Sequence, residues 1–398
     1  MPVIVLAQIG GVSVWFASNA VVPDLEHAWG AGSVAWVTGA VQLGFVLGTL
    51  LSTVTGLADR VSPRWLFLAS TIACGLANIA VIPVADNLMA VLLLRFLVGV
   101  GLAGVYPIGM KIAAGWYERG LGRALGWLVG ALVLGTASPH LMRGLGSSLP
   151  WTGVFIGTSA ACLAGGVLLA IMVPDGPFLK PGGAFSWSAA VDIARRPALR
   201  RASFAYFGHM WELYTFWAFV PVALGAWALQ RSVDLSVPLW SAAVVSIGAV
   251  GCVIGGLLAA RWGSDKVAGL SLLVSGACCL VAPLMLDTPA WLFLPWMLLW
   301  GLAVISDSPQ LSTMTAQAAP PALVGSALTL VNGLGFALTI VSLQVARLID
   351  EPKWLLFSLA VGPMIGLVAL LVRRSRDDSS TESTHQGPEA VAPPAPPR

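Results

Sequence analysis

Long stretches without any Asp, Glu, Lys or Arg constrain this sequence more than any other feature. Three of them cover residues 27–58, 235–260 and 308–346. A helix needs about 20 apolar residues to cross the hydrocarbon core of a bilayer, so each stretch is long enough for at least one crossing. Charged residues make up 10% of the 398 residues, against roughly 25% in soluble domains. The sequence therefore predicts an all-α membrane protein embedded in a lipid bilayer.

The charge-free stretches divide into twelve predicted transmembrane helices. Arg95, Glu212 and Asp307 each interrupt a stretch alone, and we place all three inside the membrane. An even number of crossings puts both ends of the chain on the same side. The predicted helices cover residues 2–23, 33–55, 65–84, 89–112, 122–142, 151–173, 202–226, 237–260, 267–286, 290–313, 323–346 and 354–373.

The distribution of Lys and Arg predicts which side this is. Of the 21 Lys and Arg residues, Arg95 lies in a predicted helix and most of the others lie on the face that also holds both termini. The exceptions are Arg143, Arg231, Arg347 and Lys353. Cytoplasmic loops carry an excess of Lys and Arg, so we expect both termini in the cytoplasm and a multi-pass protein of the plasma or inner membrane.

The two halves of the sequence repeat each other. Gly-Leu-Ala at residues 101–103 recurs at 301–303, and a Gly-x-Ala-Leu pattern with a following glycine at 122–130 recurs at 325–333. Internal repeats in one order indicate that each half folds as the same unit. Two such units related by pseudo-symmetry are expected to enclose a site where they meet.

This repeat predicts the domain organisation. We expect an N-terminal six-helix bundle over 1–173 and a C-terminal six-helix bundle over 202–373, joined by a cytoplasmic linker over 174–201. Residues 374–398 are polar and rich in proline, a composition that is typical of disorder. They are predicted to form a disordered cytoplasmic tail.

The loop after the second predicted helix contains Asp59, Arg60 and Arg64 in the segment GLADRVSPR, and a related loop in the second half keeps Arg261. Together with the intramembrane Arg95 and its following glycines, these residues resemble motifs of the major facilitator superfamily, in its prokaryotic twelve-helix form. The resemblance implies that the two loops gate the cytoplasmic side. It also implies a permease that moves a small solute by alternating access, with the first, fourth, seventh and tenth helices around the cavity.

Charges inside the membrane are the candidate functional residues. A charged side chain near the bilayer centre costs about 2.5–3.5 kcal/mol on insertion scales, so such residues usually serve a function. We predict that Glu212 and Asp307 couple transport to protons or bind substrate. His209, one helical turn before Glu212, is expected to tune it, and Arg95 is expected to act as a counter-charge or as a trigger for proton release. A purely structural ion-pair network is the alternative.

Polar and aromatic residues on the same helices are candidates for the cavity lining. Each of them also has an ordinary explanation in packing, because Trp and Tyr collect at membrane boundaries in any case. The candidates are Asn19, Gln42, Tyr106, Trp211, Tyr214, Gln310 and Asn332.

The sequence also indicates what the protein does not do. It contains none of the metallohydrolase, serine hydrolase or nucleotide-binding motifs, so we expect no enzyme, no cofactor and no metal site. A formal charge of +3 offers no basic face for nucleic acid. Nitrate uptake is disfavoured because 33–55 and 237–260 contain no arginine. Substrate and direction stay open, with protons and a small molecule as expected partners of a monomer; a small-molecule sensor with a transporter fold is the alternative.

Overall fold

The computed structural model describes residues 1–30, 32–117, 121–146, 149–179 and 185–371, and within these ranges it consists of helices without strands. Eleven helical segments there are long and apolar enough to cross a membrane, and a shorter apolar helix precedes them. The predicted all-α membrane fold is confirmed. The tail predicted at 374–398 lies outside the described residues.

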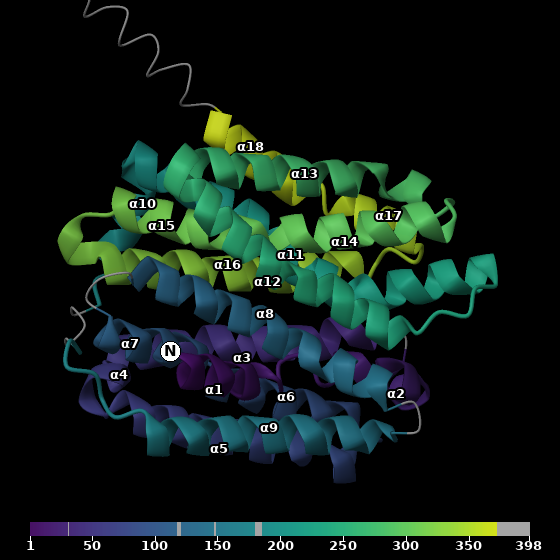
Figure 1. The fold of residues 1–398 in the computed structure, drawn as a ribbon, viewed down its shortest axis with the longest axis horizontal. Coiled ribbons are helices and arrows are strands. Elements are labelled where there is room, and N and C mark those ends of the chain that lie inside the picture. The colour runs from purple at the N-terminus through teal and green to yellow at the C-terminus, as the bar shows by residue number, and fades with distance from the viewer. Residues whose placement is uncertain (31, 118–120, 147–148, 180–184, 372–398) are drawn as a thin grey trace, which may run out of the picture.

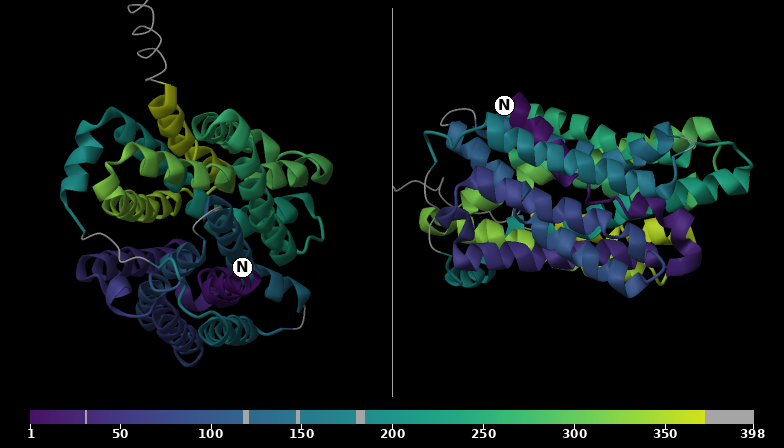
Figure 2. Two further views of the ribbon diagram at one scale, coloured as in Figure 1. Left: turned by 60° about the vertical axis from the view of Figure 1, so that its left-hand side comes forward. Right: turned by 90° about the horizontal axis from the view of Figure 1, so that it is seen from below.

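Two bundles make up the molecule, one from each half of the chain (Figure 1). The purple to teal helices of the first half lie below the teal to yellow helices of the second, and the left view in Figure 2 shows the same separation. The first half contains α1 (Pro2–Val12), η1 (Asn19–Val21), α2 (Val22–Trp29), α3 (Ser33–Thr55), α4 (Leu57–Arg60), α5 (Pro63–Ile79), η2 (Ile82–Val84), α6 (Leu88–Leu102), α7 (Tyr106–Trp116), α8 (Leu121–Leu145) and α9 (Trp151–Met172).

The second half follows a short connecting helix, α10. This helix packs against α11 and α16, and just before it the amide of Ser186 donates to Ser326 Oγ at 3.0 Å. The elements are α10 (Ser188–Arg195), α11 (Pro197–Arg231), α12 (Val237–Trp262), α13 (Ser264–Met285), α14 (Ala290–Ser306), α15 (Ser308–Ala318), η3 (Pro321–Leu323), α16 (Val324–Ala346), α17 (Pro352–Ser358) and α18 (Val361–Leu371).

The halves meet along two helix pairs. Helix α8 packs against α12, and α3 packs against α16. Helices α3 and α8 are the second and fifth crossings of the first half. Helices α12 and α16 are the second and fifth crossings of the second half. Each pair is therefore the pseudo-symmetric counterpart of the other, and the space between the pairs lies at the centre of the molecule.

Several crossings that the sequence predicts as continuous helices are broken. The predictions over 89–112 and 290–313 are wrong at their centres, where α6 ends before α7 and α14 ends before α15. Pro107 and Pro309 follow directly after these breaks. Proline has no N–H to continue the helical hydrogen bonds and disfavours helical geometry in the residue before it. The two breaks occupy matching places in the two halves.

The first crossing is also interrupted. The continuous helix predicted over 2–23 ends at Val12, and residues 13–18 continue in tighter turns in which Trp15 N donates to Val12 O and Ala17 N donates to Val14 O. Ser13 Oγ caps the preceding turn by donating to Gly10 O at 2.7 Å. This irregular stretch lies inside the protein, where its freed carbonyls need donors other than water.

Close backbone approach at glycine holds the crossings together. A Cβ at Gly99 of α6 would lie 2.0 Å from Val41 O of α3, and a Cβ at Gly301 of α14 would lie 2.0 Å from Val244 O of α12. Small residues at helix crossings allow such contact in membranes, where packing drives association. The same crossing is thus built twice, once in each half.

We expect Gly99→Ala to lower the melting temperature of the purified protein. The added methyl group must push the α3 backbone away, and overpacking of this kind costs about 1–3 kcal/mol. Gly333→Ala is the matched control, because a Cβ at Gly333 meets nothing within 4 Å. Equal melting temperatures for the two variants would contradict the close-packing assignment.

Candidate functional site

A cavity of about 490 Å³ lies between the two halves. Its first-half wall comes from η1, α2 and the start of α3, including Asn19 and Glu26, and its second-half wall comes from α11 and the end of α16, including Val222 and Arg347. Asn19 is one of the residues predicted to line a cavity, and its Nδ2 donates to Thr38 Oγ1 at 2.7 Å. The cavity is placed at the end of the molecule where the sequence predicts the outer loops.

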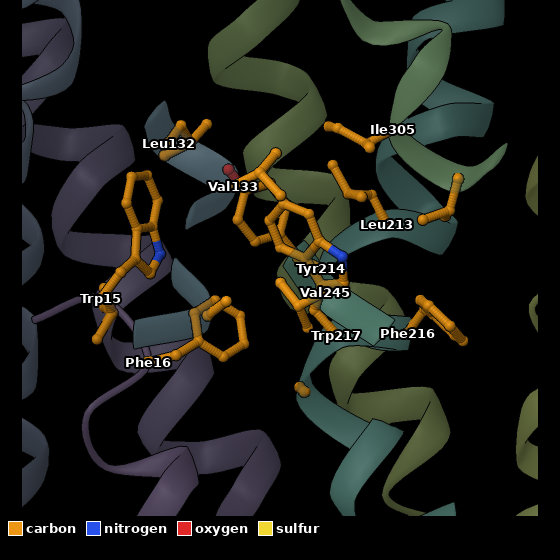
Figure 3. Close-up of a cluster of buried hydrophobic side chains, with 14 of the residues drawn as sticks. Trp15, Phe16, Leu132, Val133, Leu213, Tyr214, Phe216, Trp217, Val245 and Ile305 are labelled. Carbon is orange, nitrogen blue, oxygen red and sulfur yellow. The ribbon is translucent and has the colours of Figure 1, made fainter. Parts of the chain in front are cut away.

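Aromatic rings from both halves meet next to this cavity. We call them the cross-half aromatic cluster. Trp217 directly precedes the lining residues Ala218 and Phe219, so the cluster adjoins the cavity. Figure 3 shows the first-half rings opposite those of α11. The cluster consists of Trp15, Phe16 and Phe45 from the first half and Tyr214, Trp217 and Phe336 from the second.

The interrupted first crossing is held by Arg95. Its Nη2 donates to Val14 O at 2.8 Å and to Trp15 O at 2.6 Å, while its Nη1 donates to Asn78 Oδ1 at 2.9 Å. Arg95 is fully buried, and no carboxylate within the described ranges forms an ion pair with it. The structure therefore does not pair Arg95 with a membrane carboxylate; it uses the guanidinium to bind the freed carbonyls.

Asn78 of α5 fixes the other side of the guanidinium. Its Nδ2 donates to Thr158 Oγ1 and Ser159 Oγ of α9, both at 3.0 Å, which leaves Oδ1 to accept from Arg95. The network joins α5, α6, α9 and the first crossing. Because both Nη atoms of Arg95 are bonded and its carbonyl acceptors belong to Val14 and Trp15, the network fixes the backbone that carries Trp15 and Phe16.

Glu212 of α11 lies inside the second half. Its carboxylate accepts from Trp300 Nε1 at 2.6 Å, from Ser275 Oγ at 3.0 Å and from Cys279 Sγ at 3.4 Å. The side chain is 1% exposed. Three donors from α13 and α14 thus surround a buried carboxylate.

Asp307 and His209 form a second buried group. Asp307 Oδ1 lies 2.8 Å from His209 Nδ1, and the two side chains are 2% and 1% exposed. Asp307 occupies the break between α14 and α15. The predicted pairing of His209 with Glu212 is replaced by this contact, because the imidazole points across to the tenth crossing. The two carboxylates therefore have separate partners.

The other predicted lining residues are dispersed. Gln42 is buried on α3, and Tyr214 belongs to the cross-half aromatic cluster. Trp211 packs against Gly362 of α18, on a different face of α11. Gln310 lies in α15, where it donates to a backbone carbonyl of the preceding turn.

The last two candidates lie on other helices. Tyr106 is the first residue of α7, and Asn332 is half-buried on α16. Neither is among the residues that line the cavity described above.

The predicted gating loop contains an ion pair that joins two crossings. Lys111 of α7 pairs with Asp59 of α4 and also donates to Ala58 O at 2.5 Å. Both charged side chains are half-buried. The loop after the second crossing is thereby tied to the end of the fourth.

The three arginines of the two predicted gating loops are exposed or contact other groups. Arg60 is exposed at the end of α4, and Arg261 is exposed in the last turn of α12. Arg64 stacks over the ring of Trp65, with 5.2 Å between its guanidinium carbon and the ring centroid.

Sequence reasoning missed three residues that hold these groups in place. Asn78 is an amide in the middle of an apolar stretch, which is a detectable signal. Lys111 lies at the end of the helix predicted over 89–112, and its charge alone does not identify Asp59 as its partner. The sequence does not single out Trp300, because tryptophan is common in membrane helices. Its role as a donor to Glu212 depends on a contact between two crossings.

Comparison with known proteins identifies the family. The model of the Major Facilitator Superfamily matches residues 4–343. The chain belongs to this superfamily. The match confirms the resemblance seen in the loop and arginine motifs, and it places the protein among transporters rather than enzymes.

This superfamily member matches individual relatives over only part of their length. The niacin transporter NiaP of Acinetobacter baylyi is 33% identical over 115 residues, which are 26% of this chain and 26% of that protein. A putative metabolite transport protein of Haemophilus influenzae is 30% identical over 139 residues, 33% of this chain and 31% of the relative. The chain thus matches about a quarter to a third of each.

Solved structures agree in fold over nearly the whole chain. The proton:xylose symporter XylE superposes with a TM-score of 0.70 at 13% identity, covering 94% of each chain. The nucleoside transporter NupG superposes with a TM-score of 0.68 at 15% identity, covering 93% of this chain and 98% of the other. At these identities the likeness describes the fold alone.

We expect Arg95→Met to destabilise the superfamily member strongly. The change removes the Arg95 bonds to Trp15 O and Asn78 Oδ1 and leaves Val14 O with only its longer contact from Ala17 N. Each unsatisfied buried group costs about 1–3 kcal/mol. Arg95→Lys keeps the charge but loses the fork of donors, so its melting temperature should lie between those of Arg95→Met and the original protein. Arg60→Met, at an exposed arginine, is the control. An Arg95→Met variant as stable as Arg60→Met would contradict the role assigned to the guanidinium.

Proposed function

We propose that this superfamily member is a proton-coupled secondary transporter that moves a small organic solute by alternating access. The moving parts are the N-terminal bundle over 1–173 and the C-terminal bundle over 202–373, with 174–201 as their linker. The observation that carries the proposal is the pair of buried carboxylates, Glu212 and Asp307, each held by different partners inside the second half.

Proton coupling follows from the surroundings of these carboxylates. Asp307 and His209 belong to different crossings, so a relative movement of α11 and α14 changes their 2.8 Å contact. A buried carboxylate without its partner favours the protonated form, because burial disfavours the charged state. Uptake and release of a proton would then accompany helix movement. Each charge that crosses the membrane contributes about 2.3 kcal/mol per 100 mV, which is enough to drive accumulation.

Alternating access follows from the two ends of the molecule. The cavity lies between the halves at the predicted outer end, and the Asp59–Lys111 pair lies at the predicted inner end. We assign Arg60, Arg64 and Arg261 to the inner gate with this pair. Both termini are then cytoplasmic, in the plasma or inner membrane, and the site between the halves is complete in a single chain, as in a monomeric transporter.

The names of similar proteins support a small organic solute. One relative is named as a niacin transporter, and one structural neighbour is named as a proton:xylose symporter. Both names describe small uncharged or singly charged organic compounds. The cavity of about 490 Å³ is within the usual range for such ligands.

We expect Asp307→Asn and Glu212→Gln to abolish accumulation driven by a pH gradient while solute exchange persists. Each variant keeps the size of the side chain but cannot release a proton. The measurement is uptake of labelled nicotinate, benzoate and xylose into liposomes that contain the purified protein, with and without the gradient. Asp287→Asn is the control, since Asp287 is exposed and accepts from Gln230 at 3.0 Å.

Two results would overturn the proposal. If both carboxylate variants accumulate solute as the original protein does, the coupling assignment is wrong. If the original protein binds solutes without any flux, the protein is a sensor with a transporter fold.

We expect single cysteines to report the orientation. All five native cysteines are buried, which lowers the background of labelling. Val233→Cys, at an exposed site between α11 and α12, should react with a membrane-impermeant thiol reagent in intact cells. Trp187→Cys, at an exposed site before α10, should react only in inside-out vesicles. The reverse pattern would place both termini outside.

A further inference from the structure

We propose that the cross-half aromatic cluster is the substrate site and that it takes a planar aromatic compound with hydrogen-bond-accepting groups, above all an aromatic carboxylate. This inference rests on the proposed transport function, because it names the class of solute that the transporter carries. It is drawn from ring geometry, unpaired buried donors and local charge.

The rings of the two halves face each other nearly in parallel. Trp15 lies 5.7 Å from Tyr214 at 27° and 6.0 Å from Phe336 at 24°, and Phe16 lies 6.3 Å from Tyr214 at 22°. Centroid separations of about 4.5–7 Å are those of offset rings already in contact. A ligand ring between them needs the halves to separate by about one further carbon contact, roughly 3.5 Å, and then replaces ring-on-ring contacts with stacking on both of its faces.

Buried donors without partners point to the polar atoms of the ligand. Trp15 Nε1, Trp217 Nε1 and Gln42 Nε2 are donors with no hydrogen-bond partner in the part of the chain that the structure describes, and the acceptor Gln42 Oε1 has none there either. Trp15, Trp217 and Gln42 are each at most 1% exposed. In Figure 3 the indole nitrogen of Trp15 lies on the side of its ring that faces the second half.

Gln42 belongs to the same surface. It precedes the cluster residue Phe45 by one helical turn on α3, so the two share a face. Leaving a buried donor unpaired is costly, and a ligand with carbonyl or carboxylate oxygens between the halves would satisfy several donors at once. A site with such donors selects strongly for ligands that carry the matching acceptor.

The positive charge of Arg95, behind the cross-half aromatic cluster, favours an anionic ligand. Arg95 binds the backbone of Val14 and Trp15 and has no ion-pair partner among the described carboxylates. The first-half side of the cluster therefore has an uncompensated positive charge in a medium of low dielectric constant, where its field on a bound anion is strong. On the opposite side, the charge of Asp307 is next to His209.

The test is binding to the full-length protein in detergent, measured by calorimetry. Benzoate and cyclohexanecarboxylate are compared because they share size and charge but differ in planarity and stacking. We expect benzoate to bind at least about fivefold more tightly, from stacking on two faces. Benzamide, which is planar and neutral, should bind less tightly than benzoate. Equal affinity for benzoate and cyclohexanecarboxylate overturns the proposal, and equal affinity for benzamide overturns its charge component.

Three variants locate the site. Trp217→Phe keeps a ring but removes the donor, and should weaken benzoate binding about tenfold; Trp15→Phe should do the same. Trp211→Phe is the matched control, because Trp211 lies on the same helix and also has a buried unpaired Nε1 but packs against α18. If Trp211→Phe weakens binding and Trp217→Phe does not, the site lies elsewhere. The melting temperature of each variant establishes that it is folded.

These experiments distinguish an error in the substrate class from an error in the proposed transport function. If benzoate binds as expected but a pH gradient drives no accumulation, the aromatic site stands and the proposed transport function is wrong. If xylose accumulates and no aromatic acid binds, the transport function stands and the inference about substrate class is wrong.

Discussion

A buried guanidinium, which has no carboxylate partner among the residues that the structure describes, supports the central part of this structure. Arg95 donates to the carbonyls that the break in the first crossing exposes and is itself fixed by Asn78. A membrane interior supplies no water for such carbonyls, so an irregular first crossing is stable only beside a donor of this kind. The positions of Trp15 and Phe16, and through them the contact between the halves, depend on this interaction.

The two halves share one scaffold and differ in charge. Both contain a tight glycine crossing and a break before a proline in the fourth crossing of the bundle. The first half has a cation in its interior, and the second half has two carboxylates. The same scaffold thus buries groups of opposite charge type inside its two halves.

The sequence predicts the fold far better than the site. The prediction over 33–55 agrees with α3 (Ser33–Thr55), because length and apolar composition are enough to define a crossing. Hydropathy does not predict the breaks, because a proline inside an apolar stretch leaves the mean hydropathy high. The partners of Glu212 and His209 are not predictable for another reason. Spacing along one helix indicates neighbours on that helix, whereas Trp300 and Asp307 come from crossings about ninety to one hundred residues away. Only packing decides such contacts.

The position of Asp307 at a helix break has a mechanical consequence. The residue that contacts His209 is also the joint between two helical segments, α14 and α15. A displacement of α11 that moves His209 therefore acts on the joint itself, and through it on the angle between α14 and α15. Contact between the two crossings and bending of the tenth crossing are coupled at one residue, and a carboxylate one turn away in either segment would separate them.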